Sequence, residues 1–374
     1  MSTHQQGILG LGKTFDPRRT LGERRQAVVN LYDFLLGGGI AADERTPSVL
    51  VDAPLSKGSI RRYVAADGVE QHGAPVLLVP PLGAPPTCFD LRPGCSVAGH
   101  LVASGRPTYL LDYGAFGFSD RELGIEHLVG DIIPSAVRAV SADAGGTPVQ
   151  LVGWSMGGLL ALLTVAAFGE LPVAAVAMVA SPFDVSRHPL VWPFRALGRL
   201  TGGRVVGTAT RAMGGLPAVL VGPAFKLASF PTYVKKPLTL YAHRDDRDFL
   251  AHIEAVDLLM NGMFAYPGRA ALQVYLRLLQ RNELASGRIA GPTRDVDLAD
   301  VRVPVMNIAG ATDTLVPSAV AHGLGELVPN AAEVRLEVAP GGHLGVLTGR
   351  SAAASSWLLI DDFFDAHQEL AAAG

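Results

Sequence analysis

Short apolar segments alternate with helical patterns in two parts of the chain. Mostly apolar runs predict buried strands at 76–79, 108–112, 149–152, 173–179 and 305–309, and a further strand is expected at 334–338. Helical patterns predict helices at 96–103, 131–140, 159–168 and 355–367. Continuous apolar strands that alternate with helices are typical of a parallel sheet that is covered on both faces. The pattern therefore predicts an α/β fold with a mostly parallel central sheet.

The alternation is interrupted between residues 183 and 300. This interval contains helical patterns at 249–260 and 270–283, together with Gly-rich apolar stretches, but no convincing strand. It follows the fourth strand, whose carboxyl end faces the crevice in which such sheets bind ligands. We therefore expect a core at 59–182 and 301–374, a mostly helical cap or lid at 183–300, and an N-terminal extension at 1–58 with a helix at 26–36.

The composition narrows the class of protein. Of the 374 residues, 49% are hydrophobic and 17% are charged, which excludes a disordered chain and provides for a large core and an apolar site. The 31 basic and 34 acidic residues give a net charge of −3 without a basic cluster. Nucleic acid is therefore not an expected partner.

The chain shows no pattern for export or for a membrane span. The N-terminal segment lacks the continuous apolar stretch that a signal peptide contains. The uncharged run 144–169 is apolar only at 159–168, and a helix of that length covers about 15 Å, half of a bilayer. We expect a cytoplasmic protein without a transmembrane segment.

No cofactor is predicted. Cys88 and Cys95 are too few for a disulfide framework or a zinc site, and the histidines and carboxylates show no metal-binding spacing. Gly114 and Gly117 lack the third glycine of a dinucleotide-binding loop.

The most informative segment is Gly153-Trp154-Ser155-Met156-Gly157, which reads G-x-S-x-G between a predicted strand and a predicted helix. A serine at the apex of so sharp a turn projects above the sheet, and the glycines allow close chain approach. The helix N-terminus that follows favours an oxyanion. Ser155 is therefore the predicted nucleophile.

A nucleophilic serine needs a base, and the base needs an acid that orients it. In this kind of fold the order along the chain is serine, acid, histidine, each after a strand. His343 is the only downstream histidine that follows a strand within a glycine turn, and Asp313 follows the strand at 305–309. We predict Asp313 as the acid and His343 as the base. The competing acids lie in the insertion: Asp245, Asp246 and Asp248.

Two backbone N–H groups are expected to form the oxyanion hole. One belongs to Met156, directly after the nucleophile. The other belongs to the loop after the first apolar strand, where Pro80 and Pro81 cannot donate. Leu82 carries the first N–H after that strand and is the predicted second donor.

These motifs resemble the α/β-hydrolase superfamily and, within it, the polyhydroxyalkanoate synthase family. The resemblance runs from about residue 60 to the end of the chain, and it rests on Pro80-Pro81, Asp90-Leu91-Arg92-Pro93, Ser96, Gly105, Asp112-Tyr113-Gly114, Gly153 to Gly158, Asp313 to Pro317, and Gly342-His343. It implies an α/β-hydrolase fold with a cap insertion. Two positions depart from the synthase pattern: Ser155 replaces the synthase cysteine, and the Trp-Asn pair of the insertion is Met260-Asn261.

Three functions follow from these residues. The first is a serine hydrolase of the esterase, lipase or thioesterase type that acts on an apolar acyl ester or thioester. The second, implied by the resemblance, is an acyltransferase that uses a hydroxyacyl-CoA. The third is a non-catalytic protein that binds a hydrophobic ligand.

Substrate binding is predicted at Trp154 and Leu220. Leu220 belongs to the uncharged segment 212–225, which either lines an acyl tunnel or contacts a lipid or polymer surface, or packs against the sheet.

Overall fold

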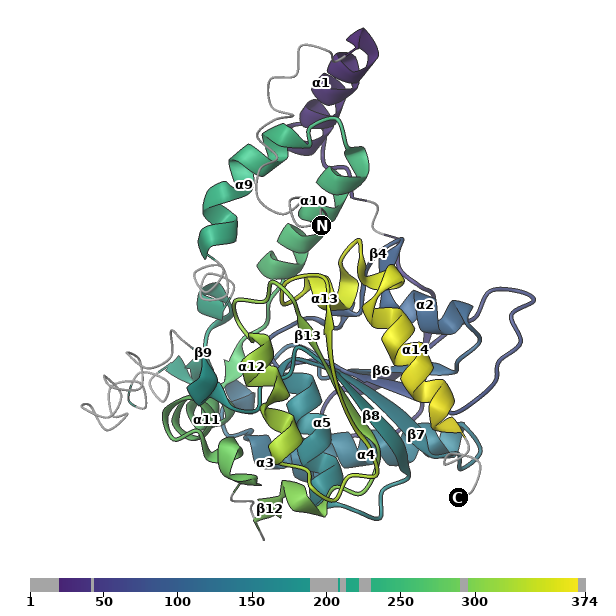
Figure 1. The fold of residues 1–374 in the computed structure, drawn as a ribbon, viewed down its shortest axis with the longest axis vertical. Helices are drawn as coiled ribbons and strands as arrows, with labels where there is room; N and C mark the ends of the chain where they lie inside the picture. The colour runs from purple at the N-terminus through teal and green to yellow at the C-terminus, as the bar shows by residue number, and fades with distance from the viewer. Residues whose placement is uncertain are drawn as a thin grey trace, which may run out of the picture.

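The molecule is built around a central sheet of eight strands (Figure 1). The computed structural model describes residues 20–41, 44–188, 208, 213–221, 230–289 and 295–368. The strand order is β1-β2-β6-β3-β7-β8-β13-β14. The strands are β1 (Ser48–Val51), β2 (Ser59–Tyr63), β3 (Val76–Val79), β6 (Thr108–Asp112), β7 (Val149–Trp154), β8 (Val173–Val179), β13 (Val305–Gly310) and β14 (Val334–Ala339). From β6 to β14 all neighbours pair in parallel. The predicted fold class is confirmed.

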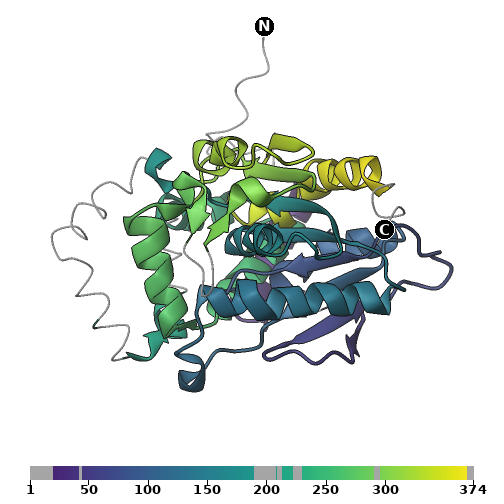
Figure 2. The ribbon, with the colours of Figure 1, turned by 90° about the horizontal axis from the view of Figure 1, so that it is seen from below.

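Helices cover both faces of this sheet (Figures 1 and 2). One face packs against α3 (Ile125–His127), a π-helix at Leu128–Ile132, α4 (Ile133–Asp143) and α5 (Met156–Ala167). The other face packs against α2 (Val97–Ala103) and α14 (Ser356–Ala366). Smaller helical elements are α12 (Ser318–Ala321), α13 (Gly345–Thr348), and 3₁₀ turns at Pro86–Cys88, Phe118–Asp120, Val185–Arg187, Leu298–Asp300, His322–Glu326 and Ala352–Ala354.

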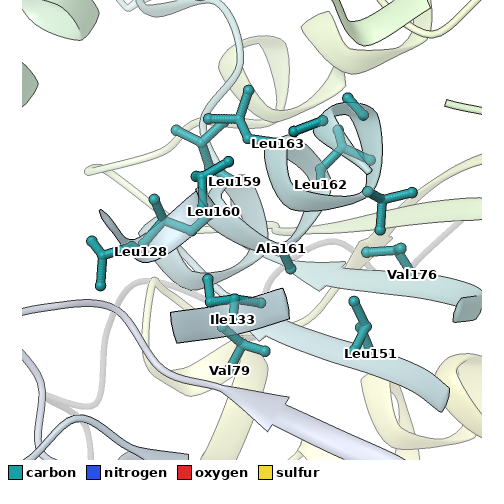
Figure 3. Close-up of a cluster of buried hydrophobic side chains, with 14 of the residues drawn as sticks. Val79, Leu128, Ile133, Leu151, Leu159, Leu160, Ala161, Leu162, Leu163 and Val176 are labelled. Atoms are coloured by element: carbon teal, nitrogen blue, oxygen red, sulfur yellow. The ribbon is translucent and has the colours of Figure 1, made fainter. Parts of the chain in front are cut away.

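Alternating strand residues form the two halves of the core. Leu77 and Val79 of β3 join the α4–α5 cluster, whereas Val76 and Leu78 of the same strand join the α2–α14 cluster. This alternation follows from the two-residue period of a strand that is buried on both faces. Figure 3 shows the α5 side, where leucines of α5 lie beside residues of the neighbouring strands. The helix that carries the elbow is thus fixed by burial on nearly all sides.

Two antiparallel strands at one edge of the sheet are not predicted by the sequence pattern. β1 pairs with β2, and β2 pairs antiparallel with β6. Neither strand has an apolar run that is buried on both faces: Leu50 of β1 is 64% exposed, and β2 contains Arg61 and Arg62. β1 lies within the range predicted as the N-terminal extension. A further short antiparallel pair joins β4 (Asp90–Arg92) and β5 (Cys95–Ser96).

Helices dominate the described part of the interval 183–300. They are α9 (Phe230–Ala242), α10 (Arg247–Asn261), α11 (Gly268–Gln273) with a π-helix at Val274–Gln280, and a 3₁₀ turn at Glu283–Ser286. The sequence pattern predicts no strand in this interval. The structure has two pairs of two-residue strands, β9 (Gly215–Leu216) with β10 (Tyr266–Pro267) and β11 (Arg288–Ile289) with β12 (Val296–Asp297). Strands of two residues are too short to show an alternation of apolar and polar positions in the sequence.

α9 and α10 project from the body together with α1 (Leu21–Leu35) (Figure 1). α1 is held on this arm by an ion pair between Arg247 and Asp33 at 2.7 Å, and by the Asn30 amide, which donates to the Arg244 carbonyl at 3.1 Å. The described helices are too short or too polar for any of them to cross a bilayer. The predicted boundary of the N-terminal extension at residue 58 and the predicted boundaries of the cap at residues 183 and 300 stay predictions.

Candidate active site

Ser155 occupies the turn between β7 and α5. Its backbone has φ 54° and ψ −122°, and it is one of three non-glycine residues with positive φ in the described part of the chain. Such a conformation costs free energy, and it persists where surrounding contacts determine it. Here the Ser155 N–H donates to the Val179 carbonyl at 2.8 Å, so the turn is fixed to the neighbouring strand.

The spacing of the glycines around Ser155 follows from close backbone contacts. A Cβ atom on Gly153 would lie 2.3 Å from the Gly158 Cα atom. A Cβ atom on Gly157 would lie 2.1 Å from the Val79 carbonyl oxygen at the end of β3. The first turn of α5 therefore approaches β7 and β3 more closely than any side chain allows, and this approach brings the serine to the carboxyl edge of the sheet.

Three predicted residues lie in one hydrogen-bonded line. His343 Nε2 is 2.9 Å from Ser155 Oγ, and His343 Nδ1 is 2.8 Å from Asp313 Oδ2. Asp313 follows β13 and His343 follows β14, so neighbouring parallel strands deliver both side chains to the same edge. With Nδ1–H donating to the carboxylate, Nε2 is free to accept the serine proton.

The Asp313 carboxylate is fixed on both of its oxygens. Its side chain is fully buried, and Oδ1 accepts the backbone N–H groups of Leu315 at 2.8 Å and Val316 at 2.9 Å. The competing acids lie elsewhere: Asp246 caps α10 by accepting the Phe249 N–H, and Asp248 forms an ion pair with Arg92 at 2.8 Å.

Leu82 and Met156 are the two residues whose backbone N–H groups are predicted to form the oxyanion hole. Leu82 is fully buried in the loop directly after β3, and Met156 is the first residue of α5. The loop is held by β10 and the residues before it: the Phe264 N–H donates to the Gly83 carbonyl at 2.8 Å, and a Cβ on Gly83 would meet the Tyr266 ring at 2.1 Å. Burial raises the pKa of Tyr266 to about 12. The two backbone donors stay predictions.

A cavity of about 270 Å³ adjoins the histidine and the aspartate. Its wall combines Trp154 and the loops after β13 and β14 with apolar side chains of α9, of α10 and of the loop that follows α10: Leu240, Ile253, Val256, Leu259, Met260 and Met263. An ion pair between Lys236 and Asp257 interrupts this apolar wall. The cavity therefore fits a substrate with an apolar acyl part.

The two predicted substrate-binding residues differ in their placement. Trp154 lines the cavity, whereas Leu220 does not, and the Leu220 side chain is 45% exposed. Residues 212 and 222–225 of the uncharged segment lie outside the described residues. The apolar wall of this cavity is formed by described side chains of α9 and α10, whereas the sequence pattern predicted an apolar wall around Leu220.

The two cysteines lie apart from this site. Both Cys88 and Cys95 are buried free thiols, and burial raises the pKa of each, which disfavours the reactive thiolate. Within the described ranges, no three histidine, cysteine or acidic side chains gather closely enough to hold a metal ion.

One contact within the site has no signal in the sequence. The Trp154 indole N–H donates to the His343 backbone carbonyl at 3.0 Å. The two residues are 189 positions apart, and no short-range pattern connects them.

The chain is similar to a known protein family and to several known proteins. Residues 74–350 match the family described as alpha/beta hydrolase fold. The poly(3-hydroxyalkanoate) polymerase subunit PhaC of Haloferax mediterranei is 24% identical over 300 residues, which are 80% of this chain and 60% of the relative. The PhaC subunit of Allochromatium vinosum is 26% identical over 287 residues, which are 76% of this chain and 79% of the relative. The chain therefore spans less than two thirds of the Haloferax relative.

One solved structure illustrates the likeness of fold. The DcsB complex with its substrate analogue matches with a TM-score of 0.50 at 17% identity, over 86% of this chain and 100% of the other. The sequence-based resemblance to the hydrolase superfamily and to polyhydroxyalkanoate synthases is confirmed by these comparisons.

Proposed function

The chain belongs to the α/β hydrolase fold family, and we propose that it is a serine hydrolase that cleaves an apolar acyl ester or thioester through an acyl intermediate on Ser155. The hydrogen-bonded line from Ser155 through His343 to Asp313 carries this proposal. A serine with a base and an orienting acid is the arrangement that nucleophilic acyl transfer requires.

In the first half of the proposed reaction, Ser155 Oγ attacks the substrate carbonyl carbon while its proton passes to His343 Nε2. Asp313 stabilises the imidazolium that forms. The backbone N–H groups of Met156 and Leu82 hold the oxyanion, and each is worth about 3 kcal/mol by analogy with other acyl hydrolases. When the tetrahedral species collapses, the bond to the alcohol or thiol breaks and the imidazolium returns the proton to the leaving group.

In the second half, water attacks the acyl-serine and gives its proton to His343. The new tetrahedral species expels Ser155, which regains a proton from the imidazolium, and the free acid leaves. The enzyme thus returns to its starting state without a cofactor.

The apolar cavity wall predicts a preference for longer acyl chains. Val256→Asp should lower kcat/KM for an octanoyl ester by about 100-fold and for an acetyl ester by less than about threefold, because each buried methylene contributes about 0.8 kcal/mol. Kinetics on p-nitrophenyl esters of graded length measure both values. The same substitution at the exposed Leu220 tests the sequence-based prediction in parallel. A selective octanoyl loss in Leu220→Asp alone would move the acyl site to that segment.

Acyl transfer to an alcohol other than water is the second candidate. It is favoured by the relatives, which carry the name poly(3-hydroxyalkanoate) polymerase subunit. A serine ester is a less activated acyl donor than the thioester of a cysteine nucleophile, so we place hydrolysis first.

The products of a hydroxyacyl-CoA separate these two reactions. We expect mostly free hydroxy acid and free CoA, because water completes the turnover of a serine ester. Mass spectrometry of the quenched mixture measures the ratio of free acid to oligomer. Dominant oligomeric ester would reverse the order of the two candidates.

A further inference from the structure

Trp154 connects the strand that carries the nucleophile to the loop that carries the base. It is the last residue of β7 and directly precedes Ser155. Its side chain is almost fully buried, at 5% exposure, and its ring centroid lies 5.4 Å from that of His343 at an interplanar angle of 42°. The indole therefore packs on the imidazole whose position relative to Ser155 decides proton transfer.

The indole N–H donates to the backbone carbonyl of His343 at 3.0 Å. A tryptophan has only this one polar hydrogen, and a buried tryptophan usually directs it to a partner. Here the partner belongs to the base itself, on its main chain. The contact does not involve either ring nitrogen of His343, which leaves both for Asp313 and Ser155.

The loop that bears His343 needs such support because it is rich in glycine. It begins with Gly341, at φ 126°, and Gly342, and Gly345 follows two residues after the histidine. The Thr312 N–H donates to the Gly341 carbonyl at 3.0 Å, which fixes the start of the loop. The Trp154 indole fixes the following part of this loop through its hydrogen bond to the His343 carbonyl.

From this geometry we infer that Trp154 is a positioning residue, whose indole N–H holds the His343 loop so that Nε2 stays within hydrogen-bond distance of Ser155 Oγ. Because Trp154 directly precedes Ser155 in the chain, any displacement of the elbow carries the base with it. Small displacements of reacting groups cost large factors in rate, so a bond remote from the reacting atoms affects turnover. The inference rests on the proposed serine hydrolase function.

The test compares two substitutions that remove the same kind of bond. Trp154→Phe removes the N–H to His343 and keeps an aromatic ring on the cavity wall. Trp357→Phe is the matched control, because Trp357 is also buried and donates its indole N–H to a carbonyl, that of Leu347 at 2.7 Å. Trp357 does not line the cavity beside His343.

We expect both variants to lose a similar amount of thermal stability, measured as Tm. Trp154→Phe should lower kcat and the rate of fluorophosphonate inactivation about tenfold, with KM within about twofold of wild type, because the lost bond orients the base rather than the substrate. Trp357→Phe should change kcat by less than about twofold. A loss confined to KM in Trp154→Phe, or equal kcat in the two variants, would overturn the inference.

Replacing Trp154 by benzothienylalanine tests the indole N–H alone. That amino acid keeps the bicyclic shape of tryptophan and has a sulfur atom in place of the indole N–H. The same tenfold loss of kcat is expected, and full activity would assign the effect to ring packing. This variant also decides the case if Trp154→Phe fails to fold. Failure of the proposed function is separable: wild-type protein would then resist fluorophosphonate at Ser155, whereas failure of this inference leaves wild type reactive and the variants unimpaired.

Discussion

Ser155→Ala should lower kcat for a p-nitrophenyl ester by about 10⁵-fold or more, because the acyl intermediate has no other oxygen on which to form. KM should change little, since the cavity wall is unaltered. Covalent labelling by a fluorophosphonate should disappear together with turnover. Steady-state kinetics and mass spectrometry of the labelled protein measure the two effects.

The control for this prediction is Ser181→Ala. Ser181 is buried close to the start of α5, where its Oγ would lie 2.2 Å from a Cβ on Gly158, and that oxygen has no hydrogen-bond partner among the described residues. Its removal should leave kcat within about threefold of wild type. Labelling that persists in Ser155→Ala would show that the nucleophile is a different residue. A wild-type protein without turnover and with an unreactive Ser155 would instead favour a hydrophobic-ligand binder.

Asp313→Asn should lower kcat by about 10⁴-fold with little change in KM. An amide oxygen still accepts the N–H groups of Leu315 and Val316, so the loop keeps its shape. The amide NH₂ group then donates to His343 Nδ1, and Nε2 carries the ring proton. That tautomer cannot accept the proton of Ser155.

Asp248→Asn is the matched control, because Asp248 lies in α10 and pairs with Arg92 and Arg350 instead of a histidine. Its kcat should stay within about threefold of wild type. The assignment of the acid is wrong if Asp248→Asn loses activity and Asp313→Asn does not.

Much of the core was predictable from local pattern. Strands such as β7 and β8 are buried over their whole length, so apolar residues dominate both, and Gln150 is the one polar side chain in them. β1 and β2 were not predictable, because an antiparallel edge tolerates exposed leucine and arginine side chains. The short pair β9 and β10 depends on contacts between segments about fifty residues apart, and two residues show no period.

The candidate triad was predictable because the order of strands determines which loops meet at one edge of the sheet. Asp313 and His343 each follow a strand, and those strands are neighbours in the structure. The apolar wall of the cavity was not predictable in this way. It arises where α10 packs over the crevice, and a helix pattern at 249–260 does not tell which side chains face the triad. For that reason Leu220 was selected from its uncharged surroundings, whereas Val256 was not.

The identity of the acylated residue is the most direct test of the proposed serine hydrolase function. Wild-type protein mixed with an octanoyl p-nitrophenyl ester, quenched in acid within the burst of p-nitrophenol release and digested, allows the acylated peptide to be sequenced by mass spectrometry. We predict one octanoyl group on the peptide that contains Ser155, formed at the rate of the burst and lost at the rate of turnover. An octanoyl group on another residue, or full turnover with no acyl group on Ser155, would contradict the account.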